Sequence, residues 1–129
     1  MSSESLHVPR EALSPEGRLL HYAITSLQEE LDAVDWYSQR ADDTEDEQLK
    51  EILLHNMREE MEHAAMLIEW LRRNNADFAG HVKTYLFTEA PIVGIERIAE
   101  AGDKPAADPG AAIGDRGAGV TIGSLKGAG

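Results

Sequence analysis

Three side chains could together bind a metal ion, because helical spacing brings them onto inward-facing positions. Glu60 and His63 stand three residues apart in "HNMREEMEHAAM" (residues 55–66), and a helix places residues at this spacing on one face. Both interrupt a line of mainly apolar residues, where a charged side chain is costly unless it is paired or holds a metal. Glu30 interrupts the corresponding line of an earlier helical segment. The three residues therefore predict a carboxylate–histidine metal site.

One chain carries only half of the residues that a di-iron site requires. Such a site in a four-helix bundle uses two single glutamates and two Glu-x-x-His motifs. This chain supplies one of each, so we expect a two-fold dimer in which each copy donates Glu30, Glu60 and His63. Hard carboxylate oxygens with one imidazole per metal suit iron better than a structural zinc. The alternative is a buried hydrogen-bond network with Asn56 and Tyr37 that sets the register of a helical dimer.

Two long helices must position these side chains. Ser14, followed by a proline and an acid, is typical of a helix start, and apolar residues at helical spacing continue to about Arg40. Thr44 with Glu47 fits a capping box for a second helix that runs to about Asn74. The predicted inward lines are Ala23, Leu27, Glu30, Val34 and Tyr37 in the first helix, and Leu49, Leu53, Asn56, Glu60, His63, Leu67 and Trp70 in the second. The short connection predicts an antiparallel hairpin.

The residues after the second helix fall into a further helical part, a segment rich in glycine and proline, and a terminal peptide. A third, shorter helix is expected from about Asp77 to Thr88, ended by Pro91, with one or two further turns over 92–100. From residue 101 the sequence is rich in Gly, Ala, Pro and Asp, which predicts a flexible linker. We therefore expect a flexible arm over 1–13, a helical domain over 14–93, a short helix and linker over 94–119, and a separate peptide over 120–129.

Composition limits the possible partners. The 129 residues include 12 Lys and Arg against 24 Asp and Glu, for a formal net charge of −12. This charge disfavours binding to nucleic acid or to anionic membrane surfaces and attracts cations. There is no cysteine, which excludes disulfides and thiolate metal sites. Neither a signal peptide nor an apolar run of membrane-spanning length is evident, so we expect a soluble intracellular protein.

Three blocks of sequence resemble the encapsulated ferritins of bacteria: "EELDAVDWYSQR" (29–40), "HNMREEMEHAAMLIEWLRR" (55–73) and "TYLFTEAPI" (84–92). The resemblance covers about residues 15–93. It implies an all-α, half-size ferritin whose antiparallel dimers complete four-helix bundles and assemble into a ring, expected to be a decamer. It also implies iron ligands at Glu30, Glu60 and His63. Tyr37 would lie beside the centre, Trp36 would line the approach to it, and an outer metal-attracting pair would correspond to Glu29 and Asp32.

The resemblance also implies an activity and a partner. Encapsulated ferritins are ferroxidases, which oxidise Fe(II) to Fe(III) with O₂ and deliver it for storage inside an encapsulin shell. Residues 120–127, "VTIGSLKG", resemble the cargo-loading peptide that docks such ferritins in the shell. The expected location is thus the bacterial cytoplasm, inside the nanocompartment. Two alternatives are a non-catalytic acidic helical cargo or scaffold protein, and a di-iron protein that handles O₂ or peroxide.

Overall fold

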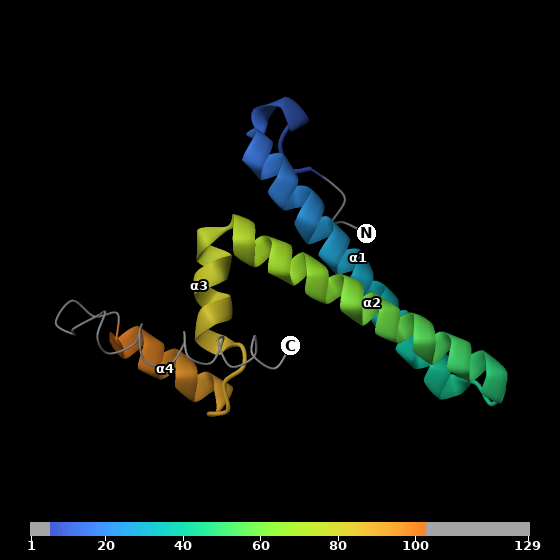
Figure 1. The fold of residues 1–129 in the computed structure, drawn as a ribbon. Coiled ribbons are helices and arrows are strands. Elements are labelled where there is room, and N and C mark those ends of the chain that lie inside the picture. The colour runs from blue at the N-terminus through green and yellow to red at the C-terminus, as the bar shows by residue number, and fades with distance from the viewer. Residues whose placement is uncertain (1–5, 103–129) are drawn as a thin grey trace. The chain divides into compact units, whose positions relative to one another are not determined.

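A computed structural model describes residues 6–102 of the chain, which are helical and contain no strand (Figure 1). The prediction of an all-α fold is confirmed. The chain divides into two compact units, residues 1–74 and 75–129. The elements in chain order are the 3-10 turn η2 (Arg10–Ala12) and the helices α1 (Pro15–Asp43), α2 (Glu47–Asn74), α3 (Ala76–Tyr85) and α4 (Ile92–Gly102). Residues 1–5 and 103–129, which include the expected linker and terminal peptide, lie outside the described residues.

Helix α1 begins as the sequence predicts and ends slightly later. The Ser14 Oγ accepts a hydrogen bond from the Gly17 N–H at 2.9 Å, so Ser14 caps the helix and a proline occupies its first turn. The helix continues past the predicted end at Arg40 to Asp43. Within the segment expected to be a flexible arm, residues 10–12 form η2, and Arg10 Nη2 donates to the Tyr22 hydroxyl at 3.1 Å.

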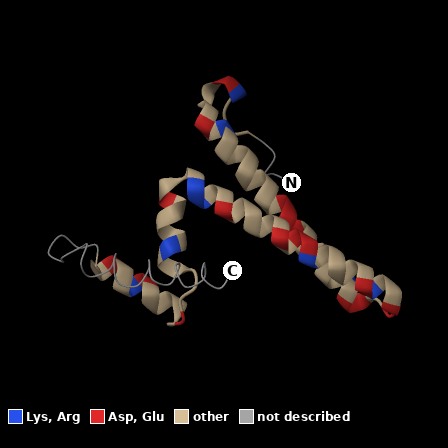
Figure 2. Cartoon of the chain, viewed as in Figure 1, with Lys and Arg blue, Asp and Glu red and all other residues tan. Residues whose placement is uncertain are grey.

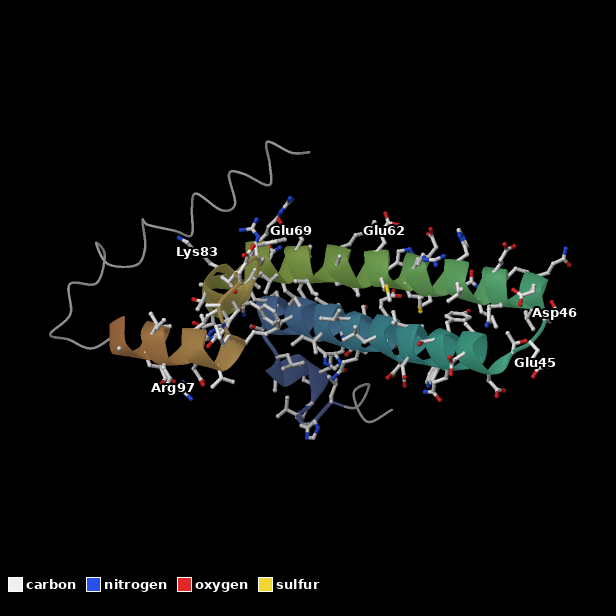
Figure 3. The ribbon with its side chains drawn as sticks, turned by 90° about the horizontal axis from the view of Figure 1, so that it is seen from below. Glu45, Asp46, Glu62, Glu69, Lys83 and Arg97 are labelled. Carbon is white, nitrogen blue, oxygen red and sulfur yellow. The ribbon has the colours of Figure 1, made fainter. Side chains whose placement is uncertain are left out.

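The predicted cap of the second helix is wrong by two residues. Thr44 instead ends α1, because its backbone N–H donates to the Arg40 carbonyl at 3.0 Å. Asp46 caps α2, since its Oδ1 accepts the Leu49 N–H at 2.9 Å. Thr44 Oγ1 supports the turn by accepting the Asp46 N–H at 3.3 Å. The connection is therefore short, and α1 and α2 form the predicted antiparallel hairpin (Figures 1 and 3).

The hairpin encloses very little core of its own. Its buried hydrophobic residues are Ala23, Ala41, Ala64 and Leu71. Leu49, predicted to face inward, is 46% exposed, because the line of α2 that meets α1 runs through Ala64 and Leu71. Large apolar side chains lie exposed on both helices: Leu19, Tyr22, Ile24, Leu31, Trp36, Leu49, Ile52, Met61 and Met66. A small domain with so little buried apolar surface is expected to pack against something else.

Helices α3 and α4 belong to the second unit. Asn75 caps α3 by accepting the Phe78 N–H at 2.8 Å, and the helix ends at Tyr85 instead of the predicted Thr88. The one or two helical turns expected over residues 92–100 form α4, which continues to Gly102. The Pro91 carbonyl accepts a hydrogen bond from the Ile95 N–H at 3.0 Å at the start of this helix. In the described part of the chain, no helix combines the length and the hydropathy that crossing a bilayer would require.

Candidate metal centre

Glu30, Glu60 and His63 converge where α1 and α2 face each other. Glu30 lies near the middle of α1, and the other two lie near the middle of α2, one turn apart. His63 Nδ1 is 3.0 Å from Glu60 Oε1 and 3.7 Å from Glu30 Oε1. The potential ligand atoms of all three residues lie within 4.8 Å of one another. Over residues 6–102, no other group of three or more His, Asp or Glu residues is this close.

The cluster is partly open to solvent. The side chains of Glu30 and Glu60 are 26% and 24% exposed, and that of His63 is 44% exposed. Acidic residues gather midway along α1 and α2, around the cluster, and again at the turn between the helices (Figure 2). The resulting negative potential attracts cations to the middle of the hairpin.

Hydrogen bonds within the cluster shift the protonation of all three groups. The hydrogen bond with Glu60 raises the pKa of Glu30, helped by partial burial, and the same bond lowers the pKa of Glu60. The hydrogen bond to Glu60 raises the pKa of His63, and the charges of Glu30 and Glu60 act in the same direction. These interactions favour protons on Glu30 and His63, with which a metal cation would compete, and they favour the ionised form of Glu60 that binds a cation.

The other residues that the sequence singled out lie outside this cluster. Tyr37 lies two turns along α1 from Glu30, about 10 Å at 1.5 Å per residue, with the Arg40 guanidinium carbon 5.5 Å from its ring centroid. Trp36 is 49% exposed. Glu29 is exposed and Asp32 is half-buried on the same helix.

Sequence reasoning missed one neighbour of the cluster. The negative charge of Glu59 also contributes to the raised pKa of His63. Glu59 and His63 are four residues apart in α2, a spacing that brings side chains together on a helix surface. This spacing was available in the sequence and could have pointed to Glu59.

The donor set fits a hard divalent cation. Two carboxylates and one imidazole are the ligand types found at carboxylate-bridged iron sites, and His63 can bind a metal through an unprotonated ring nitrogen. Three residues leave several coordination positions of a six-coordinate ion unfilled. The group is therefore able to hold a metal only with help from water or from further protein ligands.

Two long antiparallel helices, one of which contributes Glu30 to the cluster and the other the Glu60-x-x-His63 pair, define a ferritin-like helical protein. The sequence profile of the EncFtn-like family matches residues 5–89. The chain belongs to the EncFtn-like family, and this membership supports an iron-related, ferritin-like function.

Known proteins similar to this chain agree with that assignment. The chain is 52% identical over 127 residues to the encapsulated ferritin-like protein of Rhodospirillum rubrum, covering 98% of this chain and 91% of the relative. It is 38% identical over 76 residues to the encapsulin nanocompartment cargo protein EncC of Myxococcus xanthus, covering 59% of this chain and 57% of the relative. The crystal structure of protein ne0167 from Nitrosomonas europaea matches with a TM-score of 0.66 and 52% identity, covering 68% of this chain and 97% of that one.

Proposed function

We propose that this protein is a ferroxidase that oxidises Fe(II) with O₂ at a di-iron site shared between two copies of the chain. The observation that carries the proposal is the convergence of Glu30, Glu60 and His63 within 4.8 Å. In this proposal each copy contributes these three residues, so that two single glutamates and two Glu-x-x-His pairs surround two iron ions. Iron is the substrate of the site.

Two features of the hairpin support sharing between copies. First, the cluster lies near the middle of both helices and is partly open, so a two-fold axis beside it would bring two clusters together at the same level. Second, the hairpin buries few apolar side chains and exposes many, which a second hairpin could cover. A pair of hairpins would then complete a four-helix bundle.

The chemistry follows from the charge of the donors. Anionic carboxylates stabilise Fe(III) relative to Fe(II), which makes loss of an electron from each iron more favourable. When two irons react, O₂ accepts two electrons and two protons and leaves as hydrogen peroxide. The acidic surroundings of the cluster would raise the local concentration of Fe(II). In the proposed roles Tyr37 lies beside the centre, Trp36 lines its approach, and Glu29 with Asp32 attracts metal from solvent.

The partner in this proposal is an encapsulin shell. The name of the Rhodospirillum rubrum relative describes an encapsulated protein, and that of the Myxococcus xanthus relative describes a nanocompartment cargo. We assign residues 120–127, which lie outside the described residues, as the docking peptide. Deletion of residues 120–129 should abolish co-purification with a co-expressed shell and leave Fe(II) oxidation unchanged. Retained packaging after this deletion would refute the assignment.

Stopped-flow oxidation of Fe(II) tests the activity directly. Glu60→Gln and His63→Ala should slow oxidation by at least about 100-fold, since each removes a ligand from both irons. The matched controls are Glu51→Gln and His55→Ala, which change exposed residues of the same helix and should react like the wild type. Equal rates in the wild type, both site variants and both controls would exclude oxidation at this site and favour a non-catalytic cargo or scaffold protein. Faster oxidation with H₂O₂ than with O₂ would indicate a peroxide-handling protein.

A further inference from the structure

The methionines of the described part of the chain gather beside the metal cluster. They are Met57, Met61 and Met66, and all three lie on α2. Met57 precedes Glu60 by three residues, and Met66 follows His63 by three. Each of these two methionines thus lies near a candidate ligand on the helix surface, about 4.5 Å away along the axis at 1.5 Å per residue. Met61 directly follows Glu60 and neighbours Met57 at a spacing of four residues.

Packing alone does not account for methionine at these positions. Met61 is 47% exposed, Met66 is 59% exposed beside a hollow of about 480 Å³, and Met57 is half-buried. Exposed apolar positions farther from the cluster carry hydrocarbon side chains, such as Leu19 on α1 and Ile52 on α2. Leucine fills nearly the same volume as methionine. The property that distinguishes the side chains beside the cluster is therefore the thioether sulfur, which is polarizable and open to oxidation.

The reaction proposed for the cluster supplies an oxidant for these sulfur atoms. It leaves hydrogen peroxide close to Fe(II). Peroxide takes one electron from a remaining Fe(II) ion and splits into hydroxide and a hydroxyl radical, which reacts with the first side chain that it meets. A thioether adds the radical at sulfur, and loss of one electron to Fe(III) and of one proton gives the sulfoxide. In sum, a thioether and hydrogen peroxide become methionine sulfoxide and water, and the iron returns to Fe(II).

We propose that Met57, Met61 and Met66 intercept this oxidant and are converted to sulfoxides in place of the iron ligands. The chain has no cysteine, so methionine is its only oxidisable sulfur. The proposal rests on the proposed function, because Fe(II) and O₂ supply the peroxide. A second hairpin that covered these side chains would limit their access to peroxide in solution, but not to an oxidant formed at the cluster. Methionine sulfoxide can be reduced enzymatically, so the protection is renewable.

An introduced methionine distinguishes a local oxidant from one in solution. Leu19→Met places a thioether at a position that is 52% exposed and 11 residues before Glu30 (30 − 19), about 16 Å along α1. The exchange conserves volume, so the variant should fold normally. The full-length variant is loaded with Fe(II) without oxygen and then exposed to O₂, with catalase in solution to remove released peroxide. Peptide mass spectrometry then measures the sulfoxide at each methionine.

Iron turnover should place at least about fivefold more sulfoxide on Met57 and Met66 than on the methionine introduced at position 19. Peroxide added to the metal-free variant should instead oxidise the introduced methionine before Met57, because exposure then decides. Equal sulfoxide at all positions after turnover, or none while Fe(II) is oxidised, would overturn the proposal. Formation of Fe(III) is followed in the same samples. A protein that forms no Fe(III) would therefore reveal a failure of the proposed function itself, and this proposal would fall with it.

Removal of the three thioethers tests whether they protect the ligands. The triple variant Met57→Leu, Met61→Leu and Met66→Leu conserves volume and keeps every candidate ligand, so its melting temperature and initial rate of Fe(II) oxidation should match the wild type. Over repeated cycles of Fe(II) and O₂, addition of oxygen to His63 should rise at least about threefold, measured by peptide mass spectrometry. Ile52→Leu, at another exposed position of α2, is the control and should not change it. An unchanged level in the triple variant would also overturn the proposal.

Discussion

Glu30 on α1 and His63 on α2 face each other across the hairpin, with 3.7 Å between the carboxylate Oε1 and the imidazole Nδ1. The two residues are 33 positions apart in the sequence (63 − 30) and meet because the short turn between the helices folds α2 back along α1. The relationship ties the proposed metal site to the packing of the hairpin. Any change that shifts α1 against α2 should therefore alter metal binding.

Metal binding should weaken as the pH falls. The pKa of His63 is raised above its ordinary value of 6.5 by its hydrogen bond to Glu60. The proton on His63 therefore stabilises the metal-free protein below pH 6.5, and this stabilisation disappears as the pH rises through the raised pKa. A metal must displace that proton, so Fe(II) or a redox-inert divalent surrogate should bind more weakly at pH 6 than at pH 8 and release protons on binding.

Calorimetric titration in buffers of different ionisation enthalpy measures that proton release. His63→Ala should release fewer protons per metal than the wild type, and the exposed control His55→Ala should release the same number. Identical proton release by all three proteins would place the metal away from His63.

Glu30→Gln should impair binding without damage to the fold. The raised pKa of Glu30 reflects its hydrogen bond with Glu60, and a glutamine amide can donate to Glu60 in the same way. We expect metal affinity to fall by more than about tenfold, since even residues that only support metal ligands are worth this much. The free energy of unfolding should stay within about 1 kcal/mol of the wild type. Isothermal titration and urea denaturation would measure the two quantities, and unchanged affinity would exclude Glu30 as a ligand.

Leu71→Ala should destabilise the hairpin by about 2–5 kcal/mol, because Leu71 is the one large side chain in the described residues with no exposure. Leu49→Ala removes the same atoms from a side chain that is 46% exposed, and we expect it to cost less than half as much. Circular dichroism during urea unfolding, at equal protein concentration, compares the two. A similar loss of stability in both variants would mean either that a second copy covers Leu49 or that the hairpin packing described above is wrong.

The proximity of Glu30, Glu60 and His63 could be predicted from sequence, because helical periodicity puts each on the inner face of its helix and the short turn brings the two helices together. The cap of α2 could not be placed with equal certainty, because Thr44 and Asp46 both suit a helix start and only the end of α1 decides between them. The prediction that Leu49 faces inward is wrong for the single chain. An apolar stripe shows that a helix face is apolar, but it does not show whether that face packs within the hairpin or against another chain. The positive φ of 63° at Phe87 could not be predicted from sequence, because a positive φ is expected at glycine and not at phenylalanine.

The central claim is that two copies share one pair of iron ions. Diffraction from crystals soaked anaerobically with Fe(II), with anomalous differences collected at the iron edge, tests it most directly. The proposal predicts two adjacent iron peaks, each bound by His63 of one copy, with Glu30 and Glu60 contributed from both. Iron bound by the residues of a single copy, or iron located only at other acidic positions of the hairpin, would contradict it.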